Sequence, residues 1–379
     1  MRGCRRRRGR YVGSAKARRR RLPAHCRLAL ALLDDRADAE VRCLVTKRDR
    51  RAAEELVRTL PEAKRRRLAF VEGDPSSLDF GLSGAEWNEL ASRVRRIHHA
   101  AQVTAAVLDR DEAMRVNRTS TSEALELARH APELERLVLW SSTSVSGERR
   151  GFVLEDELDV RHPVRNPVEE SLRRSELMVR GAFDEVPITI LRPGLVVGDS
   201  HSGEIDRREG IYLLVSMMLD APPDRPMPMP ASTDSPLSLV PIDYVVRAGL
   251  RIVDDARSVR RTFHLVDSDP LTAGRVFELL ARSVGRSLPK PFLPPFLATR
   301  LMRLPGIQPG GADPLPRAFL DQLTTDTVYD DHGTRQLLSN TGIVCPAFES
   351  YVNALVRFVR EDHRRKTTSN VDRVRDDRL

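Results

Sequence analysis

Short apolar runs alternate with longer amphipathic stretches along most of this chain. The runs have the length and composition of buried strands, and they lie at 41–45, 68–71, 94–97, 137–140, 188–191 and 262–266. The segments between them carry apolar residues at helical spacing, as at Leu28, Leu32 and Leu33. Strands that alternate with helices predict an α/β fold with a doubly wound parallel sheet.

The stretch from Leu137 to Glu176 is where we expect any chemistry. Its apolar strand, Leu137–Trp140, delivers a cluster of hydroxyl groups to the strand's carboxyl end, where open α/β sheets hold their ligands. The cluster consists of Ser141, Ser142, Thr143 and Ser144. Two interpretations of Ser142 stay open, because its hydroxyl group can act on a ligand or simply cap the turn.

A helix opening with Asn166 and Pro167 follows this strand. The strand, the serine cluster with Gly147, and this Asn-Pro opening resemble the extended short-chain dehydrogenase/reductases, most closely the branch of thioester reductases and fatty acyl-CoA reductases. The resemblance implies a Rossmann-type sheet with a smaller, interleaved C-terminal substrate lobe. It also implies NAD(P)-dependent reduction of an acyl thioester, aldehyde or related carbonyl compound, with Ser142 holding the substrate oxygen.

Two residues depart from the family pattern, in which Tyr and Lys follow Asn-Pro at a spacing of four. This chain has Val168 and Leu172 at those positions. A phenol of pKa ~10 donates a proton to the reduced carbonyl group only when a nearby cation stabilises its anion. None of the chain's five tyrosines has Lys four residues later, so Ser142 is at most a residual catalytic group.

The N-terminal region also departs from the pattern. In the family a glycine-rich turn precedes the first helix and holds the diphosphate, but here the glycine positions fall on Arg19, Leu22 and His25. The arginine-rich leader, residues 1–27, is either a basic arm that contacts phosphate or a segment not selected for this place, as after a reading-frame slip. We favour the second interpretation.

Several residues are predicted to contact a cofactor. Lys47 and Arg48 follow the 41–45 strand where an acidic residue would favour NAD, so they predict NADP, although a solvated loop would look the same. The resemblance places Asp74 near the adenine, Ala100 and Ala101 along the cofactor, and Pro193 beside the nicotinamide. The pair His98 and His99 lacks a third ligand at suitable spacing, so no metal is expected.

Beyond residue 200 the pattern changes. Residues 211–219 form an apolar helix, 222–230 a proline-rich linker, and 291–305 either an acyl-binding wall or a packed helix. Asp243 is expected to cap a helix, and the chain after Glu361 to be disordered. The predicted domains are a leader (1–27), a Rossmann-type core (28–200), a substrate lobe (201–360) with strands returning to the sheet near 238–266, and a charged tail (361–379).

Composition limits the remaining choices. The net charge of +9 is concentrated in the leader, so nucleic-acid binding is not expected. The four cysteines show no metal or disulfide spacing, and no apolar run approaches the ~18 residues of a membrane span. We expect a cytoplasmic protein that acts on a small-molecule carbonyl or acyl substrate, with a homodimer suggested only by analogy.

Two functions compete for this chain. It is either an NADP-dependent oxidoreductase with weak residual activity, or a non-catalytic Rossmann-fold binding or scaffold protein, including a degraded gene product. Loss of the glycine turn, Tyr and Lys together favours weak or lost activity, and weak or absent cofactor binding.

Overall fold

The computed structural model describes residues 24–103, 109–206, 209–220, 234–286, 323 and 325–376. Three predictions lie outside this part of the chain: the arginine-rich segment up to residue 23, the linker at 222–230 and the apolar segment at 291–305. Among the described residues, no helix is both long and apolar enough to cross a membrane.

The main sheet has four parallel strands in the order β3-β4-β6-β9. Their bounds are Arg96–His99 (β3), Arg136–Trp140 (β4), Ile188–Pro193 (β6) and Arg261–Leu265 (β9). His99 is paired with Leu139, Trp140 with Leu191, and Pro193 with Leu265. All four strands therefore end at one edge of the sheet, which confirms the predicted parallel α/β architecture.

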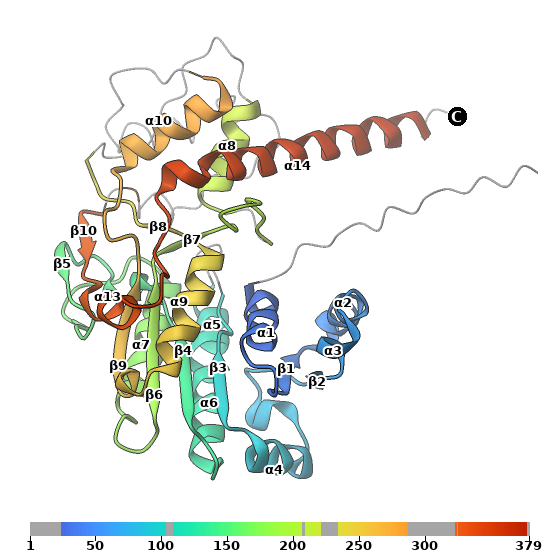
Figure 1. Ribbon diagram of the computed structural model, residues 1–379, viewed down its shortest axis with the longest axis vertical. Helices are drawn as coiled ribbons and strands as arrows, with labels where there is room; N and C mark the ends of the chain where they lie inside the picture. The colour runs from blue at the N-terminus through green and yellow to red at the C-terminus, as the bar shows by residue number, and fades with distance from the viewer. Residues whose placement is uncertain are drawn as a thin grey trace, which may run out of the picture.

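A second parallel pair lies on the β3 side of this sheet, near the first helix (Figure 1). It consists of β1 (Val41–Val45) and β2 (Leu68–Glu72). Within the described part of the chain neither strand is hydrogen-bonded to β3, so the sheet is in two pieces. The described residues form two further parallel pairs of short strands. One pair is β7 (Leu195–Val197) with β8 (Leu239–Pro241), and the other is β5 (Gly151–Val153) with β10 (Thr327–Tyr329).

Helices cover both faces of the main sheet because successive strand residues point to opposite faces. On one face Leu137, Leu139 and Ile190 pack against helices α6 and α7; on the other, Val138 and Trp140 pack against α1 and α9. The core helices are α1 (Ala24–Asp35), α2 (Lys47–Arg58), α3 (Glu62–Arg65), α4 (Gly84–Arg93), α5 (Arg110–Ala113), α6 (Ser120–His130), α7 (Pro167–Arg180) and α9 (Ile242–Asp254). Shorter turns are η1 (Leu78–Gly81), η2 (Met114–Thr119), η3 (Thr143–Ser146) and η4 (Ala256–Ser258).

The C-terminal lobe has its own apolar core. Its helices are α8 (Ile211–Asp220), α10 (Ala273–Val284) and α14 (Phe348–Asp376), whereas α13 (His332–Leu338) packs against α9 and β9 of the main sheet. Buried residues of α8, α10 and the first half of α14 pack together, among them Leu214, Phe277 and Leu355. The second half of α14 extends away from this core (Figure 1).

Three local predictions are wrong. The strand predicted at 94–97 instead spans Arg96–His99, because His98 and His99 pair with β4. The strand predicted at 188–191 continues through Arg192 and Pro193, since β9 extends alongside them. Residues 361–376 continue α14 instead of being disordered; their mixed charges are compatible with helical spacing.

Candidate active site

The carboxyl edge of the main sheet brings together several of the predicted residues. Ala100 and Ala101 follow β3, Ser142 follows β4, and Pro193 ends β6, so they lie on neighbouring strands. Lys47 and Arg48 follow β1, and Asp74 follows β2, so these three belong to the other piece of the sheet. The residues expected at the nicotinamide end of a cofactor therefore follow strands of the main sheet, and those expected at its adenine end follow the β1–β2 pair.

The Ser142 side chain acts as a cap. Its Oγ accepts hydrogen bonds from the backbone N–H of Ser144 at 3.2 Å and from the Ser144 hydroxyl group at 3.0 Å. It thereby caps the η3 turn. The bond geometry matches the capping interpretation of Ser142, and a role toward a ligand stays a prediction.

The helix that follows begins as the sequence predicted. Asn166 caps α7 by accepting the Glu169 N–H at 3.0 Å, and Pro167 occupies the first turn. Val168 and Leu172 are only 5% and 6% exposed, and they form a small apolar cluster with Ala113 and Val145. Neither of these two side chains can donate a proton or supply a cation.

A helix irregularity that the sequence did not reveal faces α7. The π-helical segment η2 buries Asn117, whose Nδ2 donates to Ser171 Oγ at 2.8 Å and whose Oδ1 accepts the Val103 N–H at 2.9 Å. The Asn117 carbonyl oxygen also accepts the Ser175 hydroxyl group at 3.0 Å. Such π-turns are frequent at functional sites, but both polar atoms of the Asn117 side chain are already engaged, Nδ2 with α7 and Oδ1 with the backbone of Val103.

A second face of α7 carries buried charges. Glu176 is fully buried, and its carboxylate accepts hydrogen bonds from Arg192 on β6, from Arg180 at 3.0 Å and from Ser141 at 2.9 Å. Burial works against ionisation of Glu176, yet the two arginines outweigh it and lower the pKa of this carboxyl group. Through these contacts the Glu176 carboxylate links β4, α7 and β6.

The same network continues to β9 and to the segment at the start of α13. Arg192 Nη1 donates to His264 Nε2 at 3.2 Å, and His264 Nδ1 donates to the Asp330 carbonyl oxygen. The Glu155 carboxylate accepts the backbone N–H groups of His264, Gly333 and Thr334. Burial lowers the pKa of His264 to about 3, so it is neutral near pH 7 and accepts from Arg192.

Another set of charged side chains, from the start of α7 and the residues before it, surrounds the backbone of Gly147. Arg165 pairs with the buried Glu169 at 3.1 Å and donates to the Gly147 carbonyl oxygen at 2.7 Å. Arg173 donates to the carbonyl oxygens of Val145 and His162, while its Nη2 is buried without a partner among the described residues. Burial raises the pKa of Glu169 although Arg165 opposes the effect.

The predicted phosphate-binding residues are exposed. Thr46 caps α2 by accepting the Asp49 N–H, so Lys47 and Arg48 lie in the first turn of that helix. A helix N-terminus and two cations together favour an anion. Asp74 is engaged locally instead: its Oδ1 accepts the N–H and hydroxyl groups of Ser76, and these bonds lower the pKa of Asp74.

Helix α1 closes part of this edge. Arg27, in its first turn, lies 3.7 Å from Asp199 and 3.5 Å from Glu204, in the loop after β7. These contacts bring the loop over the N-terminal end of α1, where a diphosphate would be held in the family.

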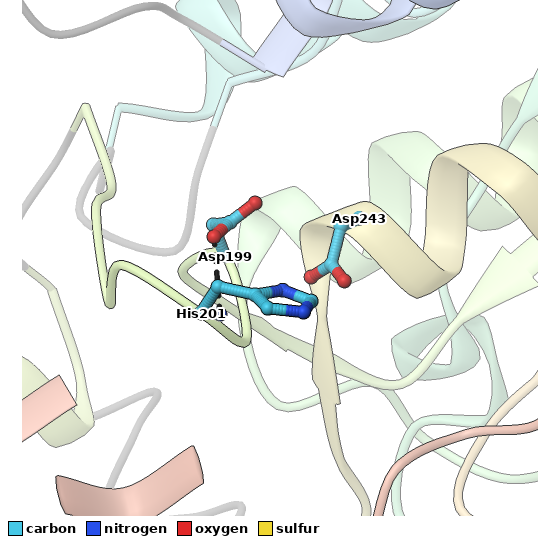
Figure 2. Close-up of side chains that lie close together, drawn as sticks. All are labelled: Asp199, His201 and Asp243. Carbon is cyan, nitrogen blue, oxygen red and sulfur yellow. Dashed lines mark hydrogen bonds between the residues drawn. The ribbon is translucent and has the colours of Figure 1, made fainter. Parts of the chain in front are cut away.

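Figure 2 shows three neighbouring side chains, Asp199 and His201 of this loop and Asp243 of α9, whose potential ligand atoms lie within 4.8 Å of one another. Asp199 Oδ1 already accepts the N–H groups of His201 and Ser202. Asp243 accepts both the N–H and the hydroxyl group of Ser200 at 2.8 Å. The group therefore shapes the loop. Our prediction that Asp243 caps its own helix is wrong, because α9 has no side-chain cap.

The paired histidines of β3 point to different faces of the sheet. His99 Nε2 bonds to Thr121 Oγ1 at 3.0 Å, and His98 Nδ1 accepts the Trp140 indole N–H at 3.3 Å. Burial lowers the pKa of each histidine to about 4. Because the two rings are separated by the sheet, they do not form a common site.

Comparison with known proteins places the chain in a family. The NAD-binding family model described as "Male sterility protein" matches residues 26–249, which is more than half of the chain. The chain belongs to this family. Family membership supports a reductase-type scaffold for a nicotinamide cofactor, in line with the resemblance read from the sequence.

Comparisons with individual proteins agree with this placement. Glycine betaine reductase ATRR of Emericella nidulans is 24% identical over 218 residues, 56% of this chain but only 17% of that protein. The terminal R domain of the myxalamid biosynthetic pathway is 25% identical with a TM-score of 0.75, covering 89% of this chain and 87% of the domain. UDP-glucuronic acid 4-epimerase from Bacillus cereus, solved with NAD, shares the fold at 16% identity and a TM-score of 0.63, covering 89% of this chain and 95% of that one.

Proposed function

We propose that this member of the male sterility protein family retains a reductase scaffold but has lost most of its capacity for hydride transfer. The substrate class would be an acyl thioester, an aldehyde or a related carbonyl compound. The observation that carries the proposal is the apolar pair Val168 and Leu172, buried where the family pattern has Tyr and Lys.

The chemistry of the two ends of the cofactor site differs. Lys47 and Arg48, exposed at the start of α2, suit the 2′-phosphate of NADP. At the other end, Ser142 is used as a cap, and Pro193 and Ala100 offer no proton. The residues present therefore fit the phosphate of NADP but not the proton transfer that accompanies reduction of a carbonyl group.

Restoring the missing pair tests this proposal. The double variant Val168→Tyr/Leu172→Lys should reduce medium-chain aldehydes with NADPH faster than the parent chain, by a factor approaching the ~10²–10⁴ that general acid catalysis provides. The size-matched variant Val168→Phe/Leu172→Met should give no gain. Turnover by the parent chain at an ordinary rate of about 10 s⁻¹ would contradict the proposal.

Cofactor binding is tested separately by calorimetry. We expect weak binding of NADPH, and weaker binding still in Lys47→Gln/Arg48→Gln, whereas NADH should not distinguish the two proteins. Micromolar binding of NADPH by the parent chain would show that the N-terminal departures from the family pattern do not impair the site.

One observation favours residual activity through another residue. The Tyr329 hydroxyl group, on β10, lies 2.9 Å from Ser146 Oγ and 3.3 Å from the Thr143 carbonyl oxygen, in the loop that also holds Ser142. Burial raises the pKa of Tyr329, although Arg165 nearby acts in the opposite direction. If activity is found, Tyr329→Phe should abolish it under this second candidate and leave it unchanged otherwise.

A further inference from the structure

We propose that the hollow between α10 and α14 binds the phosphate group of a small phosphorylated molecule. The hollow has a volume of about 380 Å³ and lies apart from the proposed cofactor site. It is lined by Ser283 of α10 and by Asn353, Val356, Arg357, Arg360, Glu361 and Arg364 of α14.

The hydrogen-bond donors of this hollow are oriented by their own contacts. The Ser283 hydroxyl group donates to Asn353 Oδ1 at 2.7 Å, which leaves the Asn353 amide N–H groups for another acceptor. Arg357 Nη2 donates to the His201 carbonyl oxygen at 3.2 Å. Arg360 Nη2 donates to the carbonyl oxygens of Ser283 and Val284. Since a guanidinium group has five N–H donors, both arginines retain donors while these bonds fix their positions.

The charge of the lining favours phosphate over carboxylate. The lining includes three guanidinium groups and one carboxylate, and among the described residues Arg357 and Arg360 form no ion pair. A phosphate monoester carries up to two negative charges and three acceptor oxygens, which paired guanidinium groups bind through parallel hydrogen bonds. A single carboxylate would leave the hollow positively charged.

The hollow also has a defined position relative to the sheet. Arg357 contacts the backbone of His201, in the loop over the carboxyl edge, while Lys47 and Arg48 lie on α2. A ligand held by α14 would therefore approach this loop from the side of the C-terminal lobe. The two phosphate sites consist of different residues and can be tested independently.

Calorimetric titration tests the site directly, with inorganic pyrophosphate and glycerol 3-phosphate as probes and acetate as the reference anion. We expect dissociation constants below about 1 mM for the phosphates and no measurable acetate binding. Asn353→Asp keeps the acceptor for Ser283 but adds a negative charge, and Arg357→Gln removes a charge-assisted donor. Each should weaken phosphate binding at least about tenfold.

Two controls keep the proposal falsifiable. Arg282→Gln alters an exposed arginine of α10 that does not line the hollow and should leave affinity unchanged. Circular dichroism must show that each variant is folded. The proposal is overturned if pyrophosphate binds no better than acetate, or if Arg282→Gln weakens binding as much as Arg357→Gln. It is also overturned if a single-stranded oligonucleotide binds more tightly than the phosphates and displaces them.

Discussion

Every residue of β4 and β6 is buried, whereas every residue of β1 is only half-buried. The buried strands are neighbours in the main sheet and are covered on both faces by helices. Strand β1 pairs with β2 and, in the described part of the chain, with no other strand. The two pieces of the sheet therefore differ in packing as well as in the residues they carry.

This difference separates two functions that a dinucleotide-binding sheet normally combines. The main sheet, with its Glu176–Arg192 network, provides the stable framework. The β1–β2 piece carries Lys47, Arg48 and Asp74, the residues expected at the adenine end. A framework can thus remain well packed while the part that would bind the cofactor depends on fewer buried contacts.

The largest effect is expected from breaking the buried pair. Glu176→Gln leaves Arg192 buried without a counter-charge, which typically costs about 3–5 kcal/mol. Glu170 lies on the same helix and pairs with Arg110 and Arg174 at the surface, so Glu170→Gln should cost about 1 kcal/mol or less. Urea unfolding measures both. Equal costs would mean that the network does not carry the stability of the main sheet.

Acid should remove the same contribution. The pKa of Glu176 is lower in the folded protein than its ordinary value, so its stabilising effect is complete above about pH 4.3 and is lost as the pH falls through the lower folded-state pKa. The difference in unfolding free energy between the parent chain and Glu176→Gln should therefore shrink below about pH 4.

A smaller but still large effect is expected at Gly147. Its φ is +61°, and an added Cβ would meet the Pro163 carbonyl oxygen and the Arg173 guanidinium group. Gly147→Ala should cost about 2–4 kcal/mol from backbone strain and overpacking together. Gly151 has φ +76° but open space around it, so Gly151→Ala should cost only the strain, about 1–2 kcal/mol. If both variants lose the same unfolding free energy in urea, then Pro163 and Arg173 can move to accommodate the added methyl group.

The sequence predicted the strands well because each is a short apolar run between turn residues. It also predicted the helix that opens at Asn166 and Pro167, because a helix start depends on local sequence. The ends of β3 and β6 were misplaced because neighbouring strands, rather than local sequence, decide how far pairing extends. Histidine and proline at these ends gave a turn-like composition that sheet pairing overrode.

The buried charge network could not be found from the sequence. Glu176 and Arg180 look like an ordinary i,i+4 surface pair on a helix, and only the packing of α7 against β6 shows that Arg192 completes it. Tyr329 and Gly333 contact this region from more than 150 residues away in sequence. Long-range contacts of this kind leave no periodic signal.

Hydrogen exchange should reveal the contrast between the two pieces of the sheet. Local opening ranges from nearly free to the full unfolding free energy, and we expect amides of β1 and β2 to exchange at least about 100-fold faster than those of β4 and β6. Addition of NADPH should slow exchange in β1 and β2 only if the cofactor binds there. Uniform protection would show that the half-buried strands are as stable as the buried ones.

The smallest effect is expected from a helix cap in the half-buried piece. Thr46 caps α2 and Ser142 caps η3, and loss of such a cap typically costs about 0.5–2 kcal/mol. Ser142→Ala should lower the global unfolding free energy by an amount in this range. Thr46→Ala should change it by less than about 0.5 kcal/mol, because a region that opens before global unfolding contributes little to it. Its effect should instead appear as faster exchange of the α2 amides. If both caps lower the global value equally, the two pieces unfold as one unit, and the cofactor-binding side of the sheet is more firmly held than its exposure indicates.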